Sequence, residues 1–251
     1  MPGWDWNATQ RYLFNPYLLA GAWTTVWLSA AAMLAGLVLG LIAALMRLSR
    51  LAPLRALAAF YVWLMRGTPL LVQLIIIFTG LPQLGIRLTV IQSALLGFSL
   101  NEGAYLSEII RAGILSVPRG QFDAARALGM SSATTMRVVI LPQAARVIIP
   151  PLGNNFNGLL KTTSLASVIS MEELLRRSQM LIQLEFRVLE IFTVTALYYL
   201  ALTSVWGIVQ GRIEARLERA YGPARPSRAR HPYTRDPARS VDGSLLQHDQ
   251  R

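Results

Sequence analysis

The sequence predicts an all-α, polytopic membrane protein with five transmembrane helices, and its apolar content carries this prediction. Of the 251 residues, 53% are hydrophobic and 15% are charged, whereas soluble domains carry about 25% charged residues. Three long stretches contain no charged residue at all: residues 12–46, 67–86 and 191–211. A helix needs about 20 mostly apolar residues to span a bilayer, so each stretch is long enough to cross.

Five spans are expected, at residues 18–46, 57–79, 88–110, 147–170 and 188–210. The third and fourth contain residues that lipid tolerates poorly, namely Asn101, Glu102, Glu108, Pro150, Pro151 and Lys161. Ionisable groups within a membrane normally face a bundle interior or a watery path. Proline breaks need neighbouring protein to satisfy the freed backbone. We therefore expect spans three and four to line the interior, and the first span to face lipid.

The placement of the arginines predicts the orientation. With the N-terminus outside, seventeen arginines fall on the cytoplasmic side and five or six basic residues fall outside. Cytoplasmic loops carry the excess of Lys and Arg, so the prediction is N-out, C-in. The first apolar run lacks a basic start and is too long for a cleavable signal peptide. The expected regions are a periplasmic N-terminus (1–17), a transmembrane domain (18–216) and a disordered, basic cytoplasmic tail (217–251).

Composition argues against several classes of function. The chain has no cysteine, so disulfides, thiolate nucleophiles and cysteine-ligated metals are excluded. The two histidines, His231 and His248, lie in the tail, so neither metal binding nor enzymatic chemistry is expected. The net charge of +11 is compatible with nucleic-acid binding, but the arginines lie between and after the apolar runs, where orientation signals lie. A nucleic-acid partner is therefore not expected.

Residues 118–142 interrupt the apolar pattern with a short polar segment. Pro118 is suited to open a helix, and Phe122, Ala125 and Leu128 recur at a spacing of three and form one apolar stripe. Gly129 stands where a helix end favours the left-handed conformation, and Ser131 or Ser132 is suited to cap a second helix. The segment predicts two short helices at a glycine elbow. They either lie on the headgroups or bind a soluble partner, which the small Ala124 and Ala125 favour.

This segment resembles the cytoplasmic EAA loop of permease subunits from bacterial ATP-binding-cassette (ABC) importers. The family pattern is Glu-Ala-Ala, three residues, Gly, nine residues, Ile, any residue, Leu-Pro. The matching positions here are Asp123, Ala124, Ala125, Gly129, Val139, Leu141 and Pro142. The polar amino-acid branch of the family is also matched by RGTPLLVQ (66–73), NEGAYLSEIIRAGI (101–114), PPLGNNF (150–156) and LLKTTSLASVI (159–169). Together the motifs cover roughly residues 18–216 in the family's order.

The resemblance implies a permease subunit in the bacterial inner membrane that moves a polar amino acid and is not itself an enzyme. It implies a separate ATPase subunit bound at residues 118–142, which would bind ATP and Mg²⁺, so no cofactor is expected in this chain. A periplasmic binding protein would deliver the substrate. A second permease subunit, either a copy of this chain or a paralogue, would complete the complex in the lipid bilayer. ATP-driven closure of the ATPases would switch the pathway between outward and inward access.

Four residues are candidates for the substrate path: Arg66, Glu102, Asn154 and Lys161. Glu102 either pairs with Lys161 or Arg66, or receives a cationic group of the substrate. Arg66 and Lys161 either contact a carboxylate of the substrate or have structural roles. Asn154, like Asn155 and Asn157, either satisfies backbone freed by the prolines or lines the path.

Two acidic positions outside this set are predicted to be structural. Glu108 precedes Arg111 by three residues, a spacing that predicts an ion pair on one helix. Glu172-Glu173 precede Arg176-Arg177 by four residues and predict a solvated outer helix face, with docking of the binding protein as the alternative.

An independent ion-coupled transporter or channel is the alternative function. It requires a coupling carboxylate in the membrane, for which Glu102 is the one feature in the sequence, and it would work without an ATPase.

Overall fold

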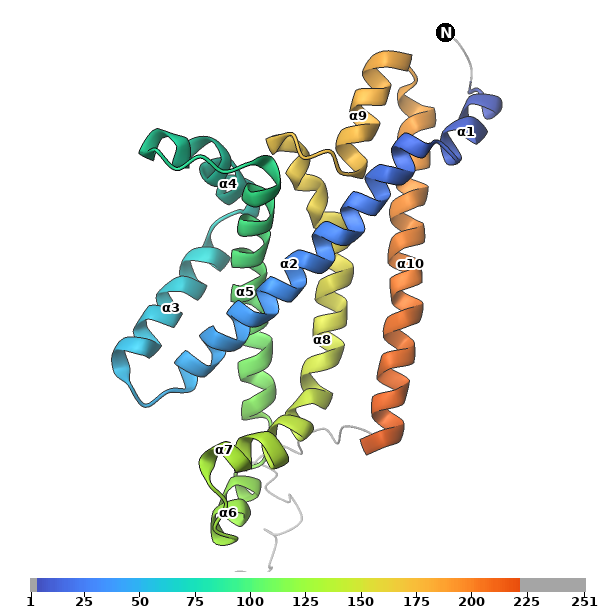
Figure 1. Cartoon of the computed structure of the whole chain (residues 1–251). Coiled ribbons are helices and arrows are strands. Elements are labelled where there is room, and N and C mark those ends of the chain that lie inside the picture. Colours follow the sequence, from blue (N-terminus) through green and yellow to red (C-terminus); the bar gives the residue numbers. More distant parts are fainter. Residues whose placement is uncertain (1–3, 222–251) are drawn as a thin grey trace, which may run out of the picture.

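A computed structural model of the chain describes residues 4–221, so the predicted tail from residue 222 onward lies outside the described residues. Those residues form helices joined by short connections (Figure 1). The helices are α1 (Trp6–Leu13), α2 (Pro16–Leu48), α3 (Ala52–Gly67), α4 (Leu70–Ile75), α5 (Val90–Leu115), α6 (Arg119–Ala127), α7 (Ser132–Thr134), α8 (Leu141–Thr162), α9 (Leu174–Glu185) and α10 (Val188–Tyr221). Residues 217–221 continue α10, so the predicted start of the tail at 217 was wrong.

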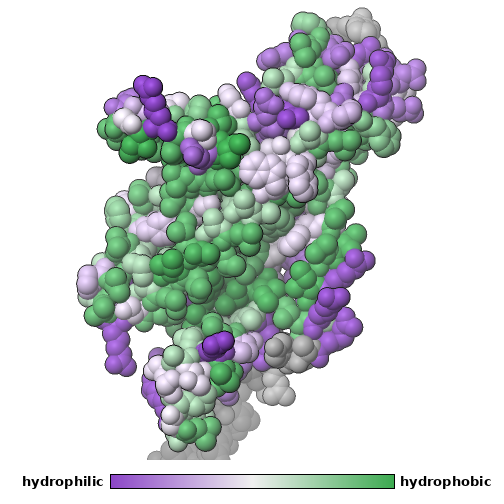
Figure 2. Space-filling model, viewed as in Figure 1, coloured by the Kyte–Doolittle hydropathy of each residue, from purple (hydrophilic) through white to green (hydrophobic). Residues whose placement is uncertain are grey.

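Two helices, α2 and α10, are long and apolar enough to cross a membrane by themselves. α5 and α8 have 26 and 22 residues, which at 1.5 Å per residue gives about 39 and 33 Å, although their polar residues lower the hydropathy. α5, α8 and α10 run side by side, and α2 crosses them obliquely (Figure 1). On the face shown in Figure 2, hydrophobic residues cover the middle and hydrophilic residues gather toward the two ends.

α2 packs along α5 more extensively than along any other helix. Gly36 and Gly40 face α5, and a methyl group at either position would lie 2.8 Å from the Cβ of Glu102 or of Leu106. Small residues permit such close approach of two helices within a membrane. The opposite face of α2 is exposed, with Leu34 at 67%. One face of the first predicted span is therefore exposed, and the other packs inside the bundle.

The predicted span 57–79 is not one straight helix. α3 ends at Gly67, α4 begins at Leu70, and the two meet at 102°; a π-helical turn (Ile76–Gly80) and a 3-10 turn (Leu81–Leu84) follow. Pro69 has no N–H and disfavours a helical residue before it, which explains the break. The Gln73 amide donates to the carbonyls of Met65 (2.9 Å) and Thr68 (3.2 Å) and satisfies the backbone that the break exposes.

At the end of the bundle that holds the N-terminus, α9 joins α2 to α10 (Figure 1). Glu173, 0% exposed, caps α9 by accepting from the backbone N–H of Leu175 (2.9 Å) and Arg176 (2.7 Å), and it accepts from the Tyr199 hydroxyl (3.1 Å). The prediction that Glu173 lies on a solvated face was wrong, because the carboxylate serves as a buried helix cap. Glu172 is half exposed and pairs with Arg177 at 3.4 Å.

Candidate functional site

The polar segment forms the elbow that its sequence predicts. α6 begins after Pro118 and ends in a Schellman motif: the N–H of Met130 donates to the Ala125 carbonyl (3.1 Å), and the N–H of Gly129 donates to the Arg126 carbonyl (2.9 Å). Gly129 has φ +72°, the left-handed region that favours glycine. The Ser131 hydroxyl then accepts from the N–H of Thr134 at 3.2 Å and caps the next helix.

The motif residues divide into an exposed set and a buried set. Asp123, Ala124 and Gly129 are exposed, together with the neighbouring Leu128 at 80%, while Leu141 at the start of α8 is 38% exposed and belongs to neither set. The buried set comprises Ala125 (3% exposed) and, partly buried, Phe122, Val139 and Pro142. It faces the bundle, where Phe122 and Val139 pack against a buried apolar cluster. The prediction that Phe122, Ala125 and Leu128 form one apolar stripe was therefore wrong, because the first two face the bundle and Leu128 faces away from it. The exposed set is the surface that remains for a partner.

The elbow continues directly into the membrane helix α8. α7 passes into a π-helical turn (Thr135–Ile140) and then into α8, so helical backbone runs from Ser132 to Thr162. The amide of Gln143 on α8 donates to the Gln121 side chain on α6 at 3.1 Å. The helix that contains most of predicted span four, 147–170, begins at Leu141, and a 3-10 turn (Thr163–Ile169) follows it. A displacement of the elbow acts on α8 without an intervening loop.

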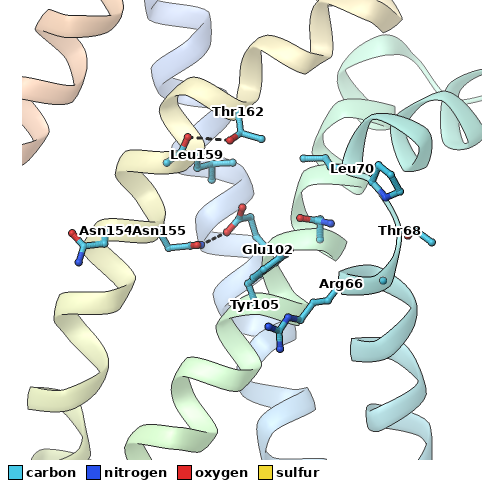
Figure 3. A pocket seen from close by; sticks show the side chains of 13 residues that line it. Arg66, Thr68, Leu70, Glu102, Tyr105, Asn154, Asn155, Leu159 and Thr162 are labelled. Atoms are coloured by element: carbon cyan, nitrogen blue, oxygen red, sulfur yellow. Dashed lines mark hydrogen bonds between the residues drawn. The ribbon is translucent and has the colours of Figure 1, made fainter.

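A pocket of about 570 Å³ opens into the bundle, and its lining is mixed polar and apolar. The broken turn between α3 and α4, the middle of α5 and the C-terminal half of α8 form its walls (Figure 3). Its lining includes three of the four predicted path residues, Arg66, Glu102 and Asn154. Lys161 is exposed and does not line the pocket, so the structure does not bring it together with the others.

Glu102 is 7% exposed, and its carboxylate accepts a hydrogen bond from the amide of Asn155 across the pocket (Figure 3). Neither predicted partner, Lys161 nor Arg66, forms an ion pair with it among residues 4–221. An amide leaves the carboxylate charge unmatched, and an ionised group in a low-dielectric site is strongly disfavoured without a countercharge. The pocket can therefore stabilise a cation at Glu102.

Arg66 lies at the edge of the pocket that is closer to Glu108. Its guanidinium lies 5.1 Å from the centroid of the Tyr105 ring, and it approaches a Glu108 oxygen at 3.7 Å. Glu108 also pairs with Arg111 at 2.9 Å, as its spacing predicts, and with Arg47 of α2. Glu108 thus joins α2, α3 and α5, and three arginines share one carboxylate. Arg66 retains capacity to bind a further anion in the pocket.

Sequence reasoning did not select Asn155, Tyr105 or Thr162, which also line the pocket. Asn155 was one of three neighbouring asparagines, and only the rotation of α8 shows which of them meets Glu102. A signal for Tyr105 was present, because it follows Glu102 by three residues and so shares its helix face. Among the described residues, no group of His, Asp or Glu side chains is arranged to hold a metal ion.

Residues 36–219 match the family described as "Binding-protein-dependent transport system inner membrane component". The chain is 46% identical over 215 residues to the L-cystine transport system permease protein TcyB of Bacillus subtilis, covering 85% of this chain and 92% of that one. It is 38% identical over 216 residues to the glutamine transport system permease protein GlnP of Escherichia coli, covering 85% and 98%.

A solved structure described as "Crystal structure of an amino acid ABC transporter with histidines" has the same fold, with a TM-score of 0.80 and 36% identity. The match covers 86% of this chain and all of that chain. Sequence and fold thus agree over nearly the whole of the described residues. The chain belongs to the family of binding-protein-dependent transport system inner membrane components.

Proposed function

We propose that this chain forms the translocation path for a polar amino acid in an ABC importer and that a separate ATPase drives it through α6. The chain is a multi-pass inner-membrane permease subunit and is not itself the ATPase. The relatives are named for transport of cystine and glutamine, both polar amino acids. Membership in a binding-protein-dependent family rules out the alternative of an independent ion-coupled transporter or channel.

The observation that carries the proposed path is the unmatched Glu102 carboxylate in a pocket whose edge holds Arg66. Every free amino acid carries an ammonium and a carboxylate. The pocket offers a side chain of opposite charge to each, a carboxylate for the ammonium and a guanidinium for the carboxylate. Glu102 would receive the ammonium or a cationic side chain, and Arg66 would receive a carboxylate. Asn154 and Asn155 add amide groups on the facing wall. Lys161 has no part in this proposal, because it lies outside the pocket.

We further propose five spans in the N-out, C-in orientation. α2, α5, α8 and α10 supply four of them, and the bent pair of α3 and α4 supplies the second. Arg47, Arg50 and Arg55 then lie at the same end of the bundle as α6, as the positive-inside rule requires. The permease domain extends from residue 18 to the end of α10 at Tyr221, and residues 118–142 lie in the cytoplasm.

Transport of this kind implies an ATPase and a periplasmic binding protein as partners, and ATP and Mg²⁺ belong to the ATPase. The ATPase would bind the exposed set: Asp123, Ala124, Leu128 and Gly129. Ala125, Val139 and Pro142 would hold that surface on the bundle, and Leu141 would begin the helix that carries its movement. A second permease subunit would complete the path.

The test of the path is a charge change at Glu102. Glu102→Gln keeps the side chain's size and removes its charge, so uptake of arginine, glutamine and cystine into proteoliposomes should fall about tenfold or more for at least one of them, as expected when a charged hydrogen-bonded contact worth about 1.5–3 kcal/mol is lost. Glu218→Gln, which changes an exposed carboxylate of α10, is the matched control. Unchanged uptake of all three amino acids by Glu102→Gln would show that the pocket is not the path.

The test of the coupling surface is Gly129→Val. A β-branched residue at φ +72° is strained, so the elbow should lose its shape and the ATPase should no longer copurify with the membrane-inserted chain. Gly207→Val is the control, because a Cβ added at Gly207 on α10 meets no atom of a neighbouring element within 4 Å. Wild-type copurification of the ATPase with Gly129→Val would mean that the elbow does not bind it.

A further inference from the structure

α8 contains a mechanically weak point between the elbow and the pocket. Pro150 and Pro151 lie inside the helix, and since neither has an N–H, two intrahelical hydrogen bonds cannot form there. The elbow is attached on the N-terminal side of this pair, at Leu141. Asn154 and Asn155, which line the pocket, follow on the C-terminal side, within one turn. Any movement passing from elbow to pocket along α8 must pass the proline pair.

Two side chains of α10 hold the turn immediately after the proline pair. The indole N–H of Trp206 donates to the Gly153 carbonyl at 2.8 Å. The amide of Gln210 donates to the side-chain oxygen of Asn154 at 3.0 Å and approaches the Pro150 carbonyl at 3.4 Å. The donors of α10 thus bind the turn of α8 that follows the proline pair, whereas the carbonyls to which the prolines cannot donate, those of Arg146 and Val147, lie one turn before it.

The packing around these contacts is close. A methyl group on Gly153 would lie 2.6 Å from the Cδ of Gln210, so glycine is needed for the amide to reach Asn154. The ring of Phe156 lies 4.4 Å, centroid to centroid, from the ring of Trp206. Glu214, one turn along α10, accepts a second hydrogen bond from the Gln210 amide at 2.8 Å and fixes its direction.

We propose that Trp206 and Gln210 of α10 are positioning residues, which clamp α8 just beyond its proline hinge so that movement of the elbow reorients Asn154 and Asn155 in the pocket. Without the clamp, the proline pair would absorb the displacement of the elbow by bending. With the clamp, the turn from Pro150 to Asn154 pivots against α10. The inference rests on the proposed function of the pocket and the elbow, and it assigns to α10 a role in coupling that neither site requires by itself.

The experiment uses the whole complex, with ATPase and binding protein, in proteoliposomes. Amino-acid uptake and phosphate release are measured together, with whichever of arginine, glutamine and cystine the wild type accumulates fastest. Gln210→Leu removes the donor and keeps the bulk of the side chain, and Trp206→Phe keeps a ring but removes the N–H. Gly153→Ala displaces Gln210 sterically. Gly207→Ala, which adds the same methyl group to open space between the two clamp residues, is the matched control.

The amount of amino acid transported per ATP hydrolysed should fall about fivefold in Gln210→Leu and in Gly153→Ala, the factor that corresponds to one hydrogen bond of typical net strength. Trp206→Phe should change the ratio in the same direction. Copurification of the ATPase and basal ATP hydrolysis should remain at the wild-type level. A purely structural role of α10 would lower uptake and hydrolysis together, which would leave the ratio unchanged.

A wild-type ratio in both Gln210→Leu and Gly153→Ala, measured in assembled complexes, would overturn the clamp. Glu102→Gln, assayed in parallel, separates this failure from failure of the proposed path. Impaired uptake by Glu102→Gln beside a wild-type ratio in the clamp variants would reject the clamp alone. Normal uptake by Glu102→Gln would reject the path, whereas a lowered ratio in the clamp variants would still support coupling through α10.

Discussion

α2 and α10 are nearly equal in length and both are apolar, yet they join the bundle in different ways. α2 has 33 residues and α10 has 34, but the most apolar stretch of α2 is 39% buried and that of α10 only 17%. α2 approaches α5 through glycines, so backbone lies close to backbone. Beyond the apolar contact of its first turns through Ile191 and Val194, α10 reaches its neighbours with polar side chains, including Tyr199, Trp206 and Gln210.

The difference teaches that two spans with similar hydropathy can have different mechanical roles. Contacts between small residues have little freedom to change, because any separation loses dispersion energy along the whole interface. A few polar contacts are replaceable one at a time and can be broken and remade during a cycle. α2 with α5 is therefore expected to form the rigid part of the subunit, and α10 the part whose contacts adjust.

The largest effect is expected where the small-residue contact is disturbed. Gly36→Val would force side-chain atoms against the Cβ of Glu102, which a methyl group alone would meet at 2.8 Å. Overpacking of this kind costs about 3 kcal/mol, at the upper end of its usual range. The apparent melting temperature of the detergent-purified subunit should fall clearly, while Gly207→Val on α10 leaves it unchanged. Equal stability of the two variants would remove the distinction between the helices.

An intermediate effect is expected at Glu173, which connects α9 to α10. Glu173→Ala would leave the partly buried Tyr199 hydroxyl and two backbone N–H groups of α9 without their acceptor. Unpaired buried donors cost about 1–3 kcal/mol, so thermal stability should fall, but less than in Gly36→Val. Glu172→Ala should have little effect because that carboxylate is half exposed. Greater loss in Glu173→Ala than in Gly36→Val would place the rigid contact at α9 instead.

The smallest effect is expected at the ion pair between Asp5, which caps α1, and Arg187, which directly precedes α10. The N–H of Ala8 and the guanidinium of Arg187, 2.7 Å from the carboxylate, lower the pKa of Asp5 below its ordinary value of 3.8. A lowered folded-state pKa means that the contact stabilises α1 above that ordinary value and is lost as the pH falls through the folded-state pKa. Asp5→Asn keeps a capping oxygen and removes the charge.

Amide hydrogen exchange of residues 6–13 measures this contact. Exchange at pH 7 should be faster in Asp5→Asn than in wild type, and the difference should vanish in acid, once the wild-type carboxyl is protonated. Arg187→Gln should match Asp5→Asn, and the double variant should add nothing, because both substitutions remove one contact. An additive double variant would show that the ion pair does not hold α1.

Local features of the sequence predicted the elbow and the Glu108–Arg111 ion pair, since each depends on residues within a few positions. The bend at Gly67–Pro69 was missed because the apolar run continues across it, although a proline there was a usable signal. The close packing of α2 was missed as well, and its signal was the pair of glycines four residues apart. Burial of Glu173 was not predictable, because an acidic cap has the same sequence whether water or protein covers it.

The candidate site was predictable by residue type but not by geometry. Glu102 was selected because a carboxylate within an apolar helix is costly, and that argument does not depend on the fold. The exclusion of Lys161 depends on the rotation of α8 over its last two turns, which hydropathy does not report. The pairing of Glu102 with Asn155 likewise requires the relative position of two helices distant in sequence.

The side-chain hydrogen bonds of the α3–α4 bend have a consequence for affinity. Asn101 donates to the side-chain oxygen of Gln73 (3.1 Å) and to the Met65 carbonyl (3.2 Å), so α5 holds the same turn that Gln73 holds from α4. Without these hydrogen bonds, the break between the two helices would be an unordered loop. A molecule entering the pocket would then have to order that loop, at an entropic cost of about 1–2 kcal/mol for each residue fixed. Here that ordering is complete before the pocket fills, and binding energy is not consumed in shaping the site. If this pocket is the proposed path, a small polar molecule would therefore bind it without first having to order its walls.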